Sequence, residues 1–200
     1  KERKVFEYKN SWLKIFDFKV FYLPYFNHPD PSVKRKSGFL TPSYGSSDSL
    51  GTQINFPYFK VLSEDKDMTF NPRYYADKSF LLQNEYRQAL RNSNIISDFS
   101  FLVGDAGSKG HFFYNQIGKI DKNLSYKLNL QNVKGDNFLK THKLKNSSPI
   151  ITNDSVLVSN VDLNWIFDDS DLNTSFIIYE DLSRNNNDRY QYIFPDFNYL

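Results

Sequence analysis

The chain has 200 residues, of which 18% are aromatic, with 19 Phe and 14 Tyr but no Cys. Without cysteine there is neither a disulfide framework nor a thiolate metal site. Its 25 basic residues nearly balance its 23 acidic ones, and a net charge of +2 gives no field typical of nucleic-acid binders. We therefore expect no nucleic-acid partner, and the many aromatic residues favour an all-β fold.

Residues 18–45 join two kinds of β-sequence, a dense aromatic run and a shorter strand-like run. Pro24, Pro29 and Pro31 lie between them, and each proline removes a backbone donor and fixes φ. We therefore expect no regular ladder to continue through this stretch.

A basic triplet, Lys34, Arg35 and Lys36, precedes Gly38 and a short strand-like run that Pro42 interrupts. Proline inside a strand is tolerated mainly at a sheet edge or a bulge. This run should therefore have one poorly paired side.

From residue 51 onward, apolar and polar residues alternate with a period of two, which predicts strands. The cleanest case is 124–131, where Leu and Tyr occupy one face and Ser, Lys, Asn and Gln the other. No segment of useful length has a helical period. The predicted strands are 51–62, 67–75, 80–90, 94–104, 110–120, 124–131, 157–167, 172–182 and 189–194.

This alternation fits a soluble sandwich as well as a membrane barrel. The connections 63–66, 91–93, 121–123 and 168–171 are short, and they alternate with a set that includes the one long connection, 134–154. Strands of about 10 residues exceed the usual soluble length of about 5 to 6. Tyr and Phe also cluster near segment ends, as in interfacial girdles. Together these features favour an outer-membrane barrel.

Several segments of the chain form a recognisable series. The most specific is FYLPYFNHPDPSVKRKSGFLTPSYGSSDSLGT, residues 21–52. The others are PYF at 57–59, MTFNPRYY at 68–75, NEYR at 84–87, GDNFL at 135–139 and IFPDFNY at 193–199. In order, spacing or kind, these segments resemble the LptD family of lipopolysaccharide-assembly proteins, also called organic solvent tolerance proteins or OstA.

The resemblance implies an all-β fold of two parts. Residues 1–33 would be the last strands of a periplasmic β-jelly-roll with a linker, and residues 34–200 the first part of an antiparallel outer-membrane β-barrel. The chain begins without Met and ends inside an aromatic run, so we expect a fragment. Family members commonly carry cysteines between the two parts, and this chain departs from that pattern.

The resemblance also implies a lateral seam in the barrel wall. Pro24 and Pro42 would match family prolines that weaken pairing between the first and last barrel strands, with Pro29, Pro31 and Gly38 completing the hinge. Lipopolysaccharide needs such a seam because its acyl chains must leave sideways while its sugars stay in water. The alternative is that Pro42 merely ends or bulges a strand.

Polar residues on one strand face would line the barrel lumen and offer partners to the sugars. Lys34, Arg35 and Lys36 would meet lipid phosphates, or else form a solvated basic linker. The candidate lumen residues are Gln83, Glu85, Arg87, Lys127 and Asn129, followed by Gln131, Asn160, Asp162 and Asn164.

No motif predicts catalysis, a cofactor or a metal site. His28, His111 and His142 are scattered without ligand spacing. The Gly-rich stretch 104–110 lacks the G-K-[ST] of a phosphate-binding loop, and the acidic stretch 168–171 lacks EF-hand spacing. We therefore expect a protein that is not an enzyme.

The predicted function is insertion of lipopolysaccharide into the outer leaflet of a Gram-negative outer membrane, with the N-terminal part in the periplasm. The expected partners are lipopolysaccharide, the outer-membrane bilayer and a periplasmic LptA-like bridge protein, and an LptE-like plug lipoprotein is a further candidate. Two alternatives remain open, a soluble β-sandwich carbohydrate-binding module with aromatic stacking platforms and a passive outer-membrane porin.

Overall fold

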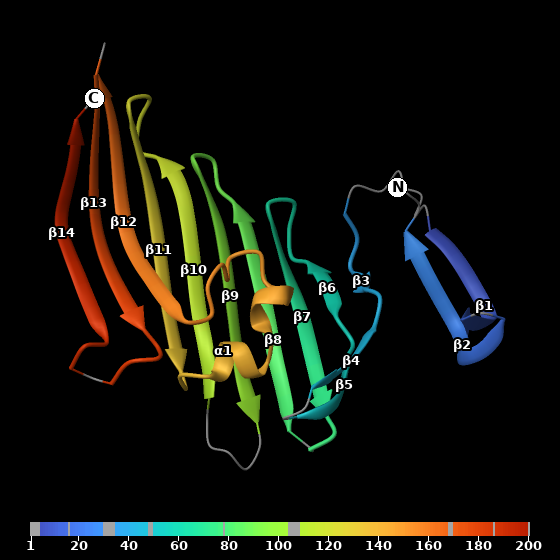
Figure 1. The fold of residues 1–200 in the computed structure, drawn as a ribbon. Coiled ribbons are helices and arrows are strands. Elements are labelled where there is room, and N and C mark those ends of the chain that lie inside the picture. Colours follow the sequence, from blue (N-terminus) through green and yellow to red (C-terminus); the bar gives the residue numbers. More distant parts are fainter. Residues whose placement is uncertain are drawn as a thin grey trace. The chain divides into compact units, whose positions relative to one another are not determined.

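A computed structural model describes residues 5–15, 17–29, 35–47, 50–77, 79–103, 109–167, 170–185 and 187–199. The strands are antiparallel throughout, so the predicted all-β fold class is confirmed (Figure 1). The chain divides into two compact units, Lys1–Gly38 and Phe39–Leu200. That the first unit ends a jelly-roll stays a prediction.

The first unit is a hairpin of β1 (Val5–Ile15) and β2 (Phe18–Pro29), whose ladder runs from Val5 opposite Pro29 to Ile15 opposite Phe18. The prediction that no ladder continues through the prolines is therefore wrong for β2. Pro24 lies opposite Asn10, whose φ of 52° takes it out of the extended conformation. The missing N–H of Pro24 thus falls where the partner strand already departs from regular pairing.

The second unit is one sheet in which strands adjacent in sequence are mostly adjacent in space. All predicted strand segments appear, and the predicted 51–62 divides into β5 and β6. The order is β14-β13-β12-β11-β10-β9-β8-β7-β5-β4, and β6 pairs with both β7 and β3. The bounds are β3 Gly38–Phe39, β4 Ser43–Ser47, β5 Gly51–Asn55, β6 Tyr58–Val61, β7 Lys66–Tyr75, β8 Phe80–Ala89, β9 Ser93–Val103, β10 Lys109–Lys119, β11 Leu124–Lys134, β12 Val156–Phe167, β13 Ser170–Asp181 and β14 Tyr190–Tyr199.

Three prolines coincide with breaks at one level of the sheet edge. Pro42 separates β3 from β4, and Pro57 separates β5 from β6. Beside them in β7 lies Pro72, whose carbonyl accepts the N–H of Phe56 at 3.2 Å, while Pro57 accepts the N–H of Leu40 at 2.8 Å. The edge of the sheet that carries β3 and β4 therefore consists of several short strands and not of one long strand.

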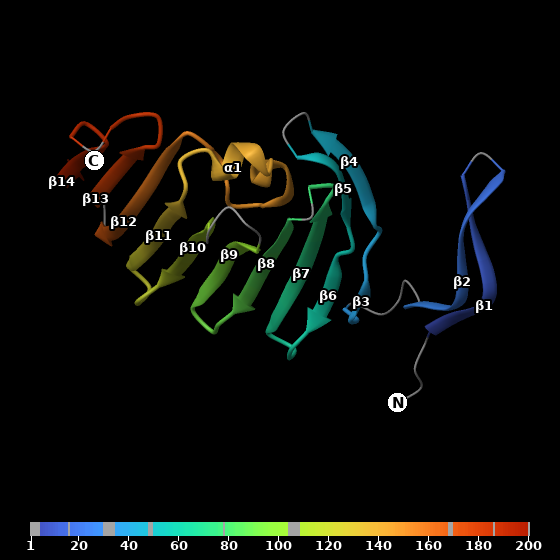
Figure 2. The same ribbon diagram turned by 90° about the horizontal axis from the view of Figure 1, so that it is seen from below.

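The two faces of the sheet differ in chemistry. We call the side on which α1 lies the covered face and the other the bare face (Figure 2). In the stretches Phe80–Gln88, Ile95–Val103, Gly110–Gly118 and Leu124–Asn132, the alternate residues that point to the bare face include no acid or base. Large apolar side chains such as Phe101, at 45% exposure, stand open there.

The long connection after β11 folds back over the covered face. It holds α1 (Phe138–Thr141) and the 3-10 turn η1 (Leu144–Ser147), which sequence periodicity missed because four residues are too few to show a helical period. No helix in the described ranges has the length and apolarity to cross a membrane.

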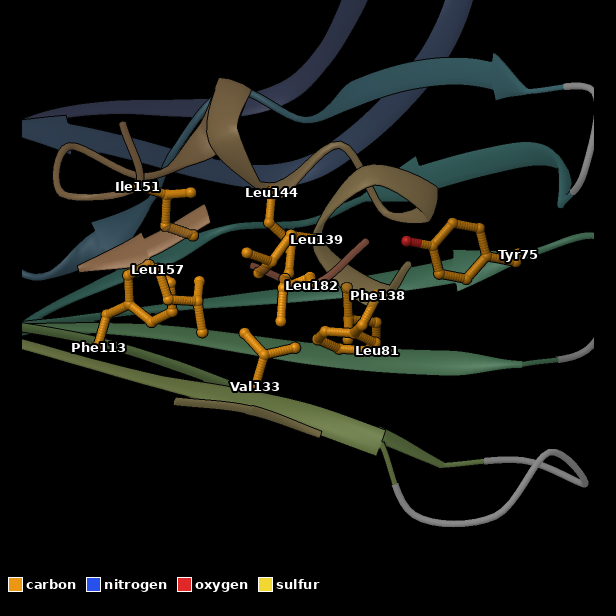
Figure 3. Close-up of a cluster of buried hydrophobic side chains, with 10 residues drawn as sticks. All are labelled: Tyr75, Leu81, Phe113, Val133, Phe138, Leu139, Leu144, Ile151, Leu157 and Leu182. Carbon is orange, nitrogen blue, oxygen red and sulfur yellow. The ribbon is translucent and has the colours of Figure 1, made fainter. Parts of the chain in front are cut away.

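The core of the second unit lies between this connection and the sheet. Phe138, Leu139, Leu144 and Ile151 come from the connection, and Figure 3 shows them against side chains of the strands. The strand side of the cluster is Tyr75, Leu81, Phe113, Val133 and Leu157, with Leu182 from just beyond β13. Apolar residues on the covered face such as Leu81, Phe113 and Val133 interrupt its polar pattern because the docked connection packs against them.

Leu139→Ala tests this docking. Leu139 is fully buried, so truncation should destabilise the docked connection by about 2 to 5 kcal/mol. Hydrogen exchange of the 138–147 amides in the full-length protein would measure the change. Lys140→Ala, at the exposed neighbouring position, should stay within about 0.5 kcal/mol. Equal protection in the two variants would show that the buried contacts do not hold the connection.

Candidate functional site

A chain of buried polar groups crosses four neighbouring strands on the covered face. Arg73 in β7 donates to the side-chain oxygen of Gln83 in β8, and Gln83 Nε2 donates to Asp98 in β9 at 3.0 Å. Asp98 Oδ1 lies 2.8 Å from His111 Nε2 in β10. All four side chains are buried, and Asp98 is fully so. A neutral amide thus connects a buried cation with a buried anion, and each has hydrogen-bond partners.

The same arginine holds the docked connection. Arg73 Nη1 donates to the carbonyl oxygen of His142 at 2.8 Å, and Arg73 Nη2 donates to Ser147 Oγ. The ring nitrogen Nδ1 of His142 lies 2.8 Å from the hydroxyl of Tyr75. His142 and Ser147 lie 69 and 74 positions from Arg73 in the sequence. Hydrogen bonds therefore fix them to β7, in addition to the apolar packing of the connection.

A hydrogen-bonded line of Ser100, His111 and Asp98 has the residue types of a Ser–His–Asp catalytic triad. Ser100 Oγ lies 2.6 Å from His111 Nδ1, and Asp98 accepts on the other side of the ring. All three are buried, and the His111 ring packs against Phe113 and Phe138. A hydroxyl covered in this way has no room beside it for an acyl substrate, so the line serves to satisfy a buried carboxylate.

No three His, Asp or Glu side chains in the described part of the chain are grouped so that they could hold a metal ion. The buried carboxylate of Asp98 is instead satisfied by Gln83 and His111.

The residues predicted for the seam lie in different settings. Pro24 lies within β2, and Pro29 ends β2. Pro42 lies at the break between β3 and β4. Gly38 begins β3, and a Cβ there would meet nothing within 4 Å, so no crowding requires glycine. Pro31 lies outside the described residues.

Of the basic triplet, Arg35 is exposed and Lys36 half-buried, and Lys34 lies outside the described residues. The predicted lumen residues share the covered face in two groups. Gln83, Glu85 and Arg87 alternate along β8, where Arg87 Nε lies 2.8 Å from Asp67 and 3.4 Å from Glu85.

Lys127 and Asn129 alternate along β11, and Lys127 lies opposite Asp162 in the ladder. The Asn129 amide donates to the carbonyl oxygen of Val158 at 2.7 Å, where β11 and β12 stop pairing. Gln131, at the next covered-face position, accepts the N–H of Val158 at 2.8 Å. The two groups thus belong to one face of the sheet.

Sequence reasoning missed Arg73, Asp98, His142 and Ser147, which form the buried network with Gln83. A charged residue in the middle of an aromatic strand is a signal that it has a buried partner, and both NPRYY and SDFSF carry one. The partner could not be read from the sequence because it comes from another strand.

His142 makes the docked connection sensitive to pH. Burial first, and the nearby positive charge of Arg73 second, lower the pKa of His142 from 6.5 to about 4, with Asp77 opposing and Lys109 adding to the shift. The docked state therefore favours neutral His142, so docking is fully stable above about pH 6.5 and weakens as pH falls toward 4. The loss should reach at most about 3 kcal/mol.

Amide protection factors of 138–147 at pH 7.5 and pH 4.5 would measure this loss. His142→Gln keeps an acceptor for Tyr75 but cannot gain a proton, so most of the pH dependence should disappear. An unchanged pH dependence in His142→Gln would assign the effect to another group.

The comparisons with known proteins agree on one family. A family model described as LptD protein matches residues 9–94. The LPS-assembly protein LptD of Pseudoalteromonas translucida is 34% identical over 135 residues, covering 65% of this chain and 18% of the relative. That of Shewanella oneidensis is 33% identical over 140 residues, covering 67% and 18%. That of Nitrosococcus oceani is 31% identical over 153 residues, covering 74% and 21%.

The chain thus spans about a fifth of the length of the curated relatives it matches. The family model covers most of β1 and continues through β8, including the proline breaks and Arg73, and the relatives are similar over 65% to 74% of the chain. By these matches the chain belongs to the LptD family.

Proposed function

We propose that this chain is part of a protein that assembles lipopolysaccharide into the outer leaflet of a Gram-negative outer membrane. The observation that carries the proposal is an antiparallel sheet with a bare apolar face and a covered polar face, in a chain of the LptD family. The relatives are named as LPS-assembly proteins. The role of the chain in this assembly depends on which face of the sheet contacts lipid tails and which face contacts water and sugars.

The bare face suits hydrocarbon. A soluble sandwich would bury its apolar face and expose its polar face. Here the connection with α1 covers the polar face, while Phe112, Val161 and Trp165 stay open on the other. This arrangement supports a membrane wall over a soluble carbohydrate-binding module, because lipid tails can cover an apolar face without another protein layer.

A row of Tyr–Gln pairs supports an interface at the end of the wall that carries the short turns. The hydroxyl of Tyr86 donates to Gln88 at 2.8 Å, and that of Tyr114 donates to Gln116 at 2.7 Å. Gln116 also donates to the hydroxyl of Tyr126 at 2.7 Å. Rings with one polar end suit the boundary between lipid tails and water, so this row would lie at the head-group level.

The covered face suits sugars. Glu85, Arg87, Lys127 and Asn129 offer charged and amide groups at alternate positions, and the side chains of Arg87 and Lys127 are exposed or partly so. Such groups can replace water around hydroxyls and phosphates of a lipid head. We propose that they line the path of the sugars.

The broken edge suits a lateral seam. Pro42, Pro57 and Pro72 each withhold an N–H from the ladder at about one level, and β4 has a described partner only in β5. A ladder bond is worth about 0.5 to 1.5 kcal/mol net, and unpaired groups against hydrocarbon cost several times more. A passive porin has no use for such a weak edge, whereas a lipid that leaves sideways does.

The periplasmic placement of the hairpin, an LptA-like bridge protein and an LptE-like plug stay predictions. The hairpin exposes aromatic rings such as Trp12 and Tyr22, which pack on each other with centroids 5.0 Å apart. These rings would be available to a neighbouring strand of the periplasmic part.

Phe112→Arg tests the membrane face. Phe112 points to the bare face between Phe99 and Asn132 and lies away from the Tyr–Gln row, so arginine there should cost about 2 to 4 kcal/mol in a bilayer. Asn115→Arg, on the covered face of the same strand, should stay within about 1 kcal/mol. Unfolding titrations of the full-length protein from lipid vesicles would compare them. Equal penalties would rule out a lipid-facing surface.

Pro42→Ala tests the seam. Alanine restores an N–H at the edge, which should strengthen pairing there, raise thermal stability and slow the appearance of labelled lipopolysaccharide at the cell surface. Pro195→Ala provides a matched control, since Pro195 lies at an irregular point of β14 and away from the edge that carries Pro42. If a correctly assembled Pro42→Ala protein delivers lipopolysaccharide at the wild-type rate, the seam lies elsewhere.

A further inference from the structure

The short-turn end of the sheet contains a cavity of about 930 Å³ between two neighbouring connections. One is the β8–β9 turn with the start of β9, and the other is the β10–β11 turn with the strand ends around it. The N–H of Lys119 donates to the carbonyl oxygen of Asn92 at 2.8 Å, which holds the two connections side by side. A backbone hydrogen bond therefore connects the two segments that line the cavity.

Three cationic side chains line this cavity: Arg91, Lys119 and Lys122. All three are exposed, and none forms a salt bridge with any residue in the described ranges. The one acid in the lining is Asp121, whose carboxylate already accepts the backbone N–H groups of Asn123 and Leu124 at 2.7 and 2.8 Å. The cavity thus has an excess of uncompensated positive charge.

The excess is local. The preceding short turn carries Glu64 and Asp65, and the sequence of the following one, 168–171, holds three aspartates. The carboxylate of Asp65 accepts from Ser63 in its own turn and from Gln88 in β8 at 3.3 Å. Acidic residues outnumber basic ones in 63–66 and 168–171, whereas basic residues outnumber the acid in the cavity lining, which indicates a defined anion site and not a generally basic rim.

Neutral groups add donors and an apolar border. Ser125 and Asn94 line the cavity from the covered face, where their hydroxyl and amide groups can donate. Leu90 and Ile117 border the same space, and Ile117 is 54% exposed. A tetrahedral phosphate can use several donors at once, and the apolar border suits the hydrocarbon that a lipid carries beside its phosphate.

We propose that this rim cavity binds the phosphate group of a phosphorylated lipid. The proposal rests on the proposed function, and it adds a ligand class and a place. The phosphate could belong to the transported lipopolysaccharide or to a phospholipid of the bilayer. Lys119, Ser125 and Ile117 point to the covered face by register, which favours the transported lipid.

The test compares the full-length wild type with Arg91→Gln/Lys119→Gln/Lys122→Gln in non-ionic detergent. The probes are lipopolysaccharide, the same lipopolysaccharide after phosphatase treatment, phosphatidic acid micelles and inorganic phosphate. The triple variant should bind lipopolysaccharide at least tenfold more weakly than wild type. Phosphatase treatment should weaken binding to wild type by a similar factor and leave binding to the variant unchanged.

Lys145→Gln provides the matched control, because Lys145 is exposed on η1 and does not line the cavity. It should bind every probe as wild type does. Lys122→Glu alone, on an exposed turn, should give a smaller loss in the same direction and guards against misfolding of the triple variant.

The outcomes distinguish a site for lipopolysaccharide from a site for bilayer phospholipid. They also test the cavity proposal separately from the proposed function. Phosphate-dependent binding of phosphatidic acid but not of lipopolysaccharide would assign the site to bilayer lipid. Inorganic phosphate binding as tightly as either lipid would overturn a lipid site. If wild type delivers lipopolysaccharide to the cell surface but the triple variant binds it within twofold of wild type, the cavity proposal fails and the proposed function stands. If wild type neither delivers nor binds lipopolysaccharide, the proposed function fails, whereas the phosphatidic acid result still decides the cavity.

Discussion

The buried guanidinium of Arg73 is the interaction on which the second unit depends. It bonds to Gln83 in the next strand and to His142 and Ser147 in the docked connection. A buried cation that loses its partners costs several kcal/mol, so the sheet and the connection cannot separate cheaply. The apolar cluster around Leu139 and Phe113 supplies the packing, and Arg73 fixes where that packing occurs. The docked connection thereby covers one face of the sheet.

The two faces of the sheet, one of them covered by the docked connection, differ in residue type. On the bare face, most alternate positions of β8 to β11 are apolar, and the Tyr–Gln row forms a polar cluster near the short turns. Gly118 in that row leaves space for the ring of Tyr126, since a Cβ there would lie 2.8 Å from it. On the covered face, the exposed charges of Arg87 and Lys127 lie toward the short turns. The buried charges of Arg73 and Asp98 lie in the network that holds the docked connection. The sheet thus changes chemistry from end to end as well as from face to face.

The edge that carries β3 and β4 follows a different rule from the body of the sheet. From β7 to β13 the strands have 10 to 12 residues, whereas this edge consists of short strands separated at Pro42 and Pro57. Proline placed at the same level in neighbouring strands concentrates the missing donors in one line. A wall with strong body ladders and a weak edge can open at that edge without unfolding, which is the property the proposed seam needs.

The sequence by itself determined the strands, their antiparallel order and the facing of residues such as Leu128 and Lys127, because a period of two is a local property of the backbone. It also led to the family through the segment around Pro42. The tertiary structure alone decided that β2 runs through Pro24 and that the long connection docks on the covered face. It also decided that Arg73, Gln83, Asp98 and His111 form one network. Those features depend on register between strands and on contacts across 69 or more positions, which no local pattern encodes.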